Sequence, residues 1–331
     1  MTDILKFSVD NLTLEQTRQI TTEPIFMDTI FASDYRFQRE GVHKDVTSKL
    51  LTVSHRDFPL RRVDGCEIPE AEARAITQRT FIPRQIGYQE KFCADDFKAT
   101  VLALLTRQNL RQSDLTGTLF GALIAQMTML ENKKHLEPMA WFADETSADP
   151  KFNQINGYWK LIQEAVTANL AAHVATYSGV ALSSGQGIQI LKDVIRNAAK
   201  ELRGMMKMDK VIYIGTEVKN QLLDDIELGL SGSGLYATEI VDGREITRFD
   251  GIEVRVKEEW DDLASTVMGY DANPSNLVCY TAKQNMVWAI NDTTDLAFEA
   301  FYSRDDMRYI MRNLFVFGVQ IDYPTLLSVA Y

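Results

Sequence analysis

The stretch that decides the fold lies between Lys44 and Phe92. Its outgoing leg reads Lys44-Asp-Val-Thr-Ser-Lys-Leu-Leu-Thr-Val-Ser-His-Arg56, and its return leg reads Arg79-Thr-Phe-Ile-Pro-Arg-Gln-Ile-Gly-Tyr-Gln-Glu-Lys-Phe92. Apolar residues alternate with polar ones in places along both legs, as they do on half-buried strands. Between the legs lies the turn-rich sequence Asp64-Gly-Cys-Glu-Ile-Pro-Glu70. The pattern predicts a long β-hairpin arm.

An isolated two-stranded ribbon is marginally stable in water at best, so we expect the arm to become ordered against something else. We find no convincing catalytic constellation in the rest of the chain, which favours another copy of the same protein as that partner. Residues 36–111 carry 14 basic and 10 acidic side chains, whereas residues 112–331 carry 19 basic and 30 acidic ones. Because opposite potentials steer and register partners, a basic arm suits docking on the acidic body of a neighbour.

The composition is that of an ordinary globular protein: the 331 residues are 45% hydrophobic and 24% charged, enough for one large or two medium cores. No apolar run is long enough to cross a bilayer and the N-terminus lacks a signal-peptide pattern, so we expect a cytosolic protein. Cys66, Cys93 and Cys279 are far apart, which disfavours a disulfide framework and a zinc site. The net charge of −11 argues against tight nucleic-acid binding, which needs clustered Lys and Arg.

The centre of the chain carries helical patterns. Ser113 is expected to cap a long helix that runs to about His135. Its leucines and Met127 recur at helical spacing, and a second stripe holds small residues, which favours close backbone approach by a neighbour. The expected packing residues of this helix are Leu115, Gly117, Leu119, Gly121, Leu123 and Met127. A looser stretch is expected over 138–150, mostly helical structure over 152–175, and a further helix from about Gly187 to Leu202.

The C-terminal half is expected to be rich in strands. Lys210–Gly215 is typical of a short buried strand, followed by Thr216 as a cap and a helix over 217–228 that ends at Gly229. Asp242-Gly243 predicts a tight hairpin between strands at 236–241 and 244–249. Further strands are expected at 251–257, at 277–281 and 286–290 as a second hairpin, and over 296–331 with breaks at Gly318 and Pro324.

The sequence contains few residues in patterns that are typical of catalysis. The histidines His43, His55, His135 and His173 do not occur in metal-binding motifs. The sequence from Gly229 to Gly234 is glycine-rich but lacks the Lys-Ser/Thr of a phosphate loop. We therefore predict no catalytic residue, no cofactor and no metal site, and we expect that the protein is not an enzyme.

The order of elements resembles that of the major capsid proteins of tailed bacteriophages, which have the Hong Kong 97-type fold. The segments that carry the resemblance are Lys210–Gly215, Gly251–Lys257 and Met311–Gln320, and it covers about residues 36–331. The fold that it implies is α+β. It divides the chain into an N-terminal arm (1–43), an extended β-hairpin loop across a neighbouring subunit (44–92), a peripheral domain with the long spine helix (93–139), an α/β axial domain (140–295) and a return to the peripheral sheet (296–331).

The resemblance also implies function and partners. The protein would self-assemble into hexamers and pentamers that form an icosahedral head around double-stranded DNA, without sequence-specific binding and without a membrane. It would assemble in the host cytoplasm and reside in the virion. Expected partners are a portal protein, decoration or auxiliary capsid proteins and a separate scaffolding protein, since few residues precede the arm. The arm residues expected to contact a neighbour are Arg56, Arg61, Arg62, Arg74, Arg79, Phe81 and Arg84.

The arm has no lysine between Lys49 and Lys91, so covalent cross-links from its tip, seen in some members of the family, are not expected. Two alternatives stay open. An encapsulin-type nanocompartment shell shares the fold and differs in its contents. A cytosolic α/β enzyme with an inserted β-arm would need a concave site with perturbed titratable groups.

Overall fold

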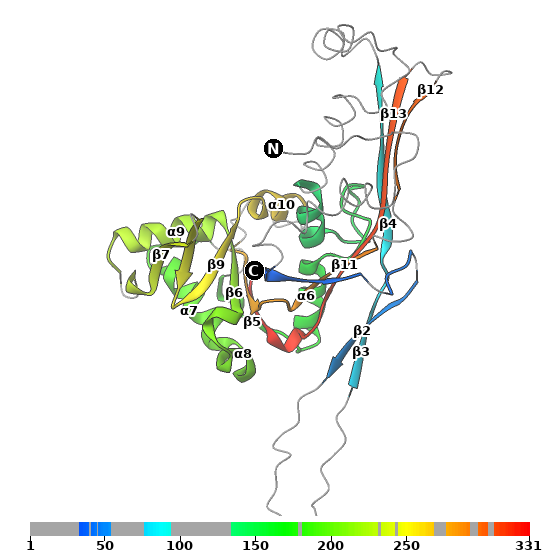
Figure 1. Ribbon diagram of the computed structural model, residues 1–331. Coiled ribbons are helices and arrows are strands. Elements are labelled where there is room, and N and C mark those ends of the chain that lie inside the picture. The colour runs from blue at the N-terminus through cyan, green and yellow to red at the C-terminus, as the bar shows by residue number, and fades with distance from the viewer. Residues whose placement is uncertain are drawn as a thin grey trace, which may run out of the picture.

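Two sheets that share one core form the body of the molecule, and a narrow ribbon leaves it (Figure 1). The computed structural model describes residues 33–39, 41–44, 46–53, 76–93, 134–177, 181–230, 233–241, 244–267, 276–291, 297–303 and 308–331. The arm tip and most of the predicted spine helix lie outside the described residues. With them lie Arg56, Arg61, Arg62, Arg74, Leu115, Gly117, Leu119, Gly121, Leu123 and Met127.

The larger sheet has seven strands, in the order β5-β14-β10-β6-β9-β8-β7. Its central strands are buried along their whole length, as expected for continuous apolar runs. The strands are β5 (Ala172–His173), β6 (Lys210–Gly215), β7 (Tyr236–Val241), β8 (Arg244–Phe249), β9 (Ile252–Lys257), β10 (Val278–Ala282) and β14 (Leu327–Ala330).

Two amphipathic helices, α7 (Gln186–Asn197) and α9 (Thr216–Glu227), pack with this sheet around one apolar cluster. Residues of α7 such as Leu191 contribute to the cluster, together with Leu222 of α9 and Ile212 of β6. A short helix, α8 (Lys200–Gly204), follows α7 and precedes β6.

The second sheet is built on one long strand, β13 (Arg308–Ile321). Its first part pairs antiparallel with both β4 (Arg84–Cys93) and β12 (Ala297–Ser303). Its last part pairs with β11 (Met286–Asn291), and β11 in turn pairs in parallel with β1 (Tyr35–Gln38). The N-terminal strand β1 is thus built into the same sheet as the C-terminal part of the chain.

Aromatic side chains from both sheets pack in one core and so join the two sheets. The cluster contains Tyr213 from the larger sheet and Trp288 from the smaller one, with helical residues between them, and all four tryptophans are buried in it. Trp141 Nε1 donates a 2.9 Å hydrogen bond to Tyr35 Oη, and the Trp141 and Trp260 ring centroids are 4.6 Å apart. The helical elements are residues 134–142, α6 (Tyr158–Thr167) and α10 (Trp260–Val267). The four tryptophans therefore act as anchors of the shared core.

The arm is present at its base as an antiparallel ribbon of β2 (Ser48–Val53) and β3 (Ile76–Phe81), in register from Ser48 opposite Phe81 to Val53 opposite Ile76. Figure 1 shows this ribbon projecting away from both sheets. The return leg was expected to stay in the ribbon as far as Phe92, and this is wrong. After Pro83, which has no N–H to give to a ladder, the chain enters β4 and pairs with β13 of its own sheet.

The predicted hairpin around Lys283 is also wrong. β10 pairs with β6 and β14, whereas β11 pairs with β1 and β13, so the connection carries the chain from one sheet to the other. Gln284 adopts a left-handed φ of 61° there. The side-chain amide of Asn285 stabilises this connection with two hydrogen bonds to Tyr323. Its Oδ1 accepts from the backbone N–H of Tyr323 at 2.7 Å, and its Nδ2 donates to the carbonyl of Tyr323 at 3.0 Å.

Gly318 does not break a strand, because β13 runs through it. A Cβ at Gly318 would lie 3.2 Å from Pro83 Cα, so the glycine lets the foot of the arm approach the sheet. Residues 324–326 do interrupt the chain, as Pro324 predicts. The following strand, β14, joins the seven-stranded sheet, so residues 327–330 do not return to the smaller sheet as expected.

The helices differ from expectation in their ends. The stretch expected to be loose from residue 138 is still helical as far as Phe142. Of residues 152–175, which were expected to be mostly helical, only α6 is α-helical. The helix expected at 187–202 is split into α7 and α8 by extended backbone at Ala198. Thr216 is the first residue of α9 and not its cap; Asp261 Oδ2 accepts the Glu217 N–H instead, at 3.0 Å. The strands expected at 210–215, 236–241 and 244–249 are confirmed.

Candidate assembly surfaces

The described residues contain no group of three or more His, Cys, Asp or Glu side chains that could hold a metal ion. Within the same ranges, no helix has the length and apolar character needed to span a bilayer. The surfaces with unusual chemistry lie instead where the arm meets the body and around the strand that enters from the N-terminal side.

The foot of the arm is fixed to the body by packing and by one hydrogen bond. Phe81 at the end of β3 packs against the buried side chains of Val42, Ala289 and Val316. Gln320 Nε2 on β13 donates a 3.2 Å hydrogen bond to the carbonyl of Thr80. The ribbon therefore leaves the body from a defined anchor, and the predicted contact residue Phe81 serves within its own chain as that anchor.

A groove runs between the foot of the arm and helix α6. It consists of two adjoining hollows of about 330 and about 310 Å³ that share Thr80, Leu161, Glu164 and Gln320 in their walls. We call it the arm-base groove. Two large apolar side chains line it while largely exposed: Ile82 at 46% and Leu170 at 43%. Sequence reasoning missed this groove because its walls lie about 80 residues apart in the chain, and no local pattern reports such a meeting.

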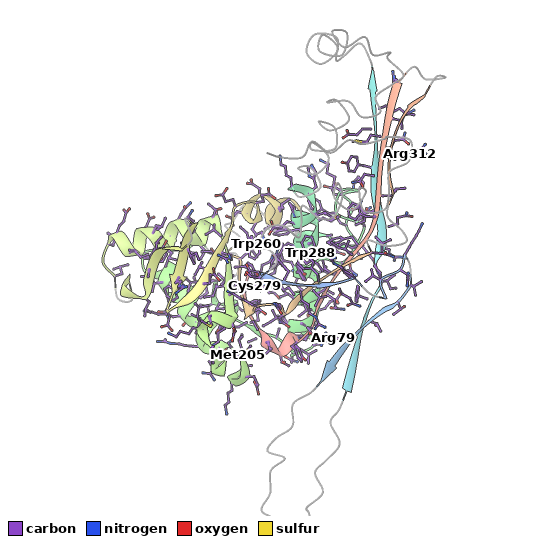
Figure 2. The ribbon with its side chains drawn as sticks, viewed as in Figure 1. Arg79, Met205, Trp260, Cys279, Trp288 and Arg312 are labelled. Atoms are coloured by element: carbon purple, nitrogen blue, oxygen red, sulfur yellow. The ribbon has the colours of Figure 1, made fainter. Side chains whose placement is uncertain are left out.

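Arg79 reaches into the arm-base groove (labelled in Figure 2). The guanidinium makes no hydrogen bond or ion pair that the described part of the chain records. Burial lowers the pKa of Arg79, and the nearby carboxylate of Asp322 opposes that shift. Asp322 itself is bonded to Arg36 Nη1 at 2.7 Å. Arg79 is thus a partly buried cation whose guanidinium can still form an ion pair with a carboxylate of another molecule.

Arg84 differs from Arg79 although both were predicted to contact a neighbour. Its Nε and Nη2 both lie 3.2 Å from Glu145 Oε1, and both side chains are more than a third exposed. An exposed pair of this kind contributes little to stability. The structure therefore gives Arg84 an internal partner, and its role between subunits stays a prediction.

A network of charges holds the N-terminal strand onto the body. Arg255 on β9 donates to Asp34 Oδ2 at 3.0 Å and to Glu253 Oε1 at 2.6 Å, and Lys283 Nζ lies 2.6 Å from Glu253 Oε2. Burial favours the neutral form of Glu253, but the hydrogen bond of Lys283 and the charge of Arg255 outweigh it and lower the pKa of Glu253. The arrangement makes β1 and the two sheets one platform from which the arm projects.

No protein-family model and no curated protein matches the sequence. Solved structures do match its fold. A chain of the satellite phage P4 procapsid, a structure that includes the size determination protein Sid, superposes with a TM-score of 0.59 at 10% identity, over 95% of this chain and 98% of that one. The capsid of the myovirus phage XM1 superposes with a TM-score of 0.52 at 11% identity, over 91% of this chain and 90% of that one.

These matches assign the fold. The chain has the α+β fold of tailed-phage major capsid proteins, the Hong Kong 97-type fold that the sequence predicted. The identities of 10% and 11% make the likeness one of architecture.

Proposed function

We propose that this protein is the structural subunit of a phage head. Copies of it assemble into hexamers and pentamers, and these close into an icosahedral shell around double-stranded DNA in the virion. The role is architectural and needs no catalytic centre. The observation that carries the proposal is a β-ribbon that leaves the body from a fixed foot, in a chain with the capsid fold.

Physical reasoning links the ribbon to assembly. Two strands without a sheet or helix to cover them gain too little from burial to be stable alone. A neighbour that covers the ribbon supplies that burial, and each 1,000 Å² of apolar surface removed from water contributes roughly 25 kcal/mol before the cost of ordering. A closed shell repeats the contact many times, so each copy can be modest. The ribbon would thus become stably ordered only when the next subunit binds and covers it.

The proposed partners follow from the same role. A separate scaffolding protein would act during assembly, a portal protein and decoration proteins would join the shell, and assembly would take place in the host cytoplasm. The acidic body would face packed DNA without binding it tightly, since the chain carries a net charge of −11. An encapsulin-type shell would assemble in the same way around a packaged enzyme, so the contents of purified particles distinguish these two roles.

The register of the ribbon allows a clean test. Val53 and Ile76 lie directly opposite each other, so replacing residues 54–75 by Asn-Gly closes the ribbon with a two-residue turn. We expect the shortened protein to stay folded and soluble, because the shared aromatic core and both sheets are untouched. It should form no closed particles under conditions in which the full-length protein does.

Circular dichroism and thermal unfolding check the fold of the shortened protein, and negative-stain microscopy with light scattering checks assembly. Normal particles from the shortened protein would contradict the proposal. A shortened protein that melts well below the full-length protein would show instead that the arm stabilises its own subunit.

A further inference from the structure

A cluster of methionines stands out from the body at one end of the larger sheet. Met206 and Met208 are each 70% exposed and Met205 is 36% exposed, in the turn between α8 and β6. We call residues 205–208 the methionine tip. Figure 2 shows Met205 at the lower edge of the body, on the side toward which the ribbon also projects. Methionine is flexible and polarisable, and it is often used on surfaces that receive a partner.

The backbone of the methionine tip is well anchored although its side chains are exposed. Lys210 is buried and its Nζ donates a 2.8 Å hydrogen bond to the carbonyl of Arg203. The N–H of Lys283 donates a 2.8 Å hydrogen bond to the carbonyl of Asp209. Leu202 is fully buried in the core beneath α8. The tip is therefore a fixed apolar protrusion, so its exposure is a feature of the folded chain.

Three exposed cations precede the methionine tip closely in the chain. Arg196 lies in the last turn of α7, and Lys200 and Arg203 lie on α8; none of the three has an ion-pair partner within the ranges that the structure describes. Lys207, in the tip itself, is paired with Asp250 at 2.8 Å. Glu201 on α8 and Asp209 next to the tip are exposed as well, so the surface around the methionines is apolar with a small excess of positive charge.

The opposite end of the same sheet carries acids. The exposed residues of α9 are Glu217, Asn220, Asp224 and Glu227, which follow one helical stripe. Glu258 and Glu259, just before α10, are exposed beside the start of α9, where Thr216 Oγ1 approaches the Glu258 carbonyl at 3.5 Å. The acids Glu217, Asp224, Glu227, Glu258 and Glu259 form the acidic face, and the described residues provide no ion-pair partner for them. Leu228, 65% exposed, adds an apolar edge.

The methionine tip and the start of the acidic face lie far apart within one molecule. β6 begins at Lys210, next to the tip, and ends at Gly215, where α9 begins, so the start of α9 lies roughly 20 Å from the tip along one strand. Figure 1 shows α8 and the ribbon on one side of the body, with α9 and α10 on the other. A two-fold contact between two tips would set two surfaces with an excess of cations against each other. A head-to-tail contact brings that excess against acids, and such contacts form a ring when the rotation between copies closes.

We propose that the methionine tip of one copy docks on the acidic face of the next copy, as the second contact of a head-to-tail ring in which the ribbon makes the first. The inference rests on the proposed self-assembly and names the surfaces that meet. Arg196, Lys200 and Arg203 would pair with Asp224, Glu227 and the acids before α10. Met206 and Met208 would pack against Leu228 and the half-buried side chains of α9.

Site-specific photo-cross-linking tests the contact directly. The photoreactive amino acid p-benzoylphenylalanine replaces Met206 in the full chain, and ¹⁴N and ¹⁵N copies are mixed so that mass spectrometry separates cross-links between copies from those within one. We expect cross-links between copies that fall in residues 217–228 or 258–262. The control position is Thr167, exposed on α6, which should not label those segments. Cross-links from position 206 to any other segment, or none in assembled protein, would overturn the inference.

Charge exchange provides an independent test. The pair Lys200→Glu and Arg203→Glu should lower the yield of oligomers about tenfold, and so should the pair Asp224→Lys and Glu227→Lys. All four changes together should restore most of the yield, because the attraction is re-formed with its signs exchanged. Single-surface variants that assemble like the unaltered protein, or a combined variant no better than either pair, would overturn the inference. Circular dichroism verifies that each variant is folded.

The outcomes separate this inference from the proposed function. The predicted cross-links in open oligomers that never close would support the contact and contradict the shell. Closed particles with cross-links elsewhere would support the shell and overturn the contact. An unaltered protein that remains a monomer at all concentrations would contradict both.

Discussion

Asp225 is a fully buried carboxylate on α9 that holds the start of α7. Its Oδ1 accepts a 2.6 Å hydrogen bond from the N–H of Gly185, and its Oδ2 accepts a 3.0 Å hydrogen bond from the N–H of Ile188. Residues at the start of α7 offer no side-chain cap of their own. A cap supplied from 37 to 40 residues away thus joins the two helices that pack with the larger sheet.

Asp225→Ala should therefore destabilise the protein strongly. It leaves the buried N–H of Ile188 without an acceptor, at about 1–3 kcal/mol, and removes the acceptor of the partly buried N–H of Gly185 as well. Thermal unfolding followed by circular dichroism should show a fall in melting temperature of roughly 10 °C. Asp225→Asn keeps the shape and one acceptor oxygen, so its loss should be smaller. Equal melting temperatures for Asp225→Ala and the unaltered protein would refute this role.

Arg79 and Arg84 form a matched pair for assembly, because both are arginines at the foot of the arm. Arg84 is paired with Glu145, whereas Arg79 makes no hydrogen bond or ion pair within the described residues and feels only the nearby charge of Asp322. Arg79→Gln should slow assembly several-fold if the guanidinium receives a carboxylate from a neighbour. Arg84→Gln should change the rate by less than about twofold, since the ion pair with Glu145 is exposed and contributes little. Light scattering gives both rates; an effect of Arg84→Gln as large as that of Arg79→Gln would count against this assignment.

At the scale of elements, the charge network around β1 predicts a pH dependence. The pKa of Glu253 is lowered in the folded protein, so the folded state favours its carboxylate form. The network therefore contributes fully above the ordinary range of a Glu and loses its contribution as pH falls through that range, from about pH 5 to pH 3. Glu253→Gln removes the titrating group.

We expect Glu253→Gln to lower the melting temperature by about 2–4 °C at neutral pH. The difference between the variant and the unaltered protein should shrink as the pH falls to about 3, because the unaltered protein then loses the same interactions. Glu201→Gln, at an exposed position on α8, is the control and should follow the unaltered protein at every pH. A difference that stays constant with pH would contradict a role for the Glu253 charge.

Local signals predicted some elements with their correct ends. Lys210–Gly215 is an apolar run closed by a glycine, and the hairpin strands 236–241 and 244–249 flank a strong turn dipeptide. The crossing at residues 283–285 could not be predicted in the same way, since a turn between two apolar runs reads as a hairpin. Its true geometry depends on Asn285 and Tyr323, which are 38 residues apart.

At the scale of the whole molecule, the order of elements along the chain was enough to predict the capsid fold. The candidate assembly surfaces were only partly predictable. Arg79 and Phe81 were named from the arm sequence and both lie at the arm-base groove, but their contact with a neighbour stays a prediction. The roles of Leu161 and Glu164 in that groove come from tertiary packing between α6 and β3. The methionine tip does have a sequence signal, a run of three methionines within 205–208, but only the folded structure shows that these side chains are exposed.

The core and the projecting parts of the molecule have different expected roles. One aromatic cluster joins both sheets into a rigid platform, while the ribbon and the methionine tip extend from it on the same side. A rigid body with projecting contacts can meet its neighbours in one fixed orientation, which a closed shell requires. Changes in the core should therefore alter stability first, and changes on the projecting surfaces should alter assembly first.

Negative-stain electron microscopy of the purified full-length protein, expressed alone and with a candidate scaffolding protein, is the decisive test of whether the protein builds a shell. We expect closed, roughly spherical particles of uniform diameter built from rings of subunits. A monodisperse monomer in both preparations, at concentrations well above those of assembly reactions, would contradict it.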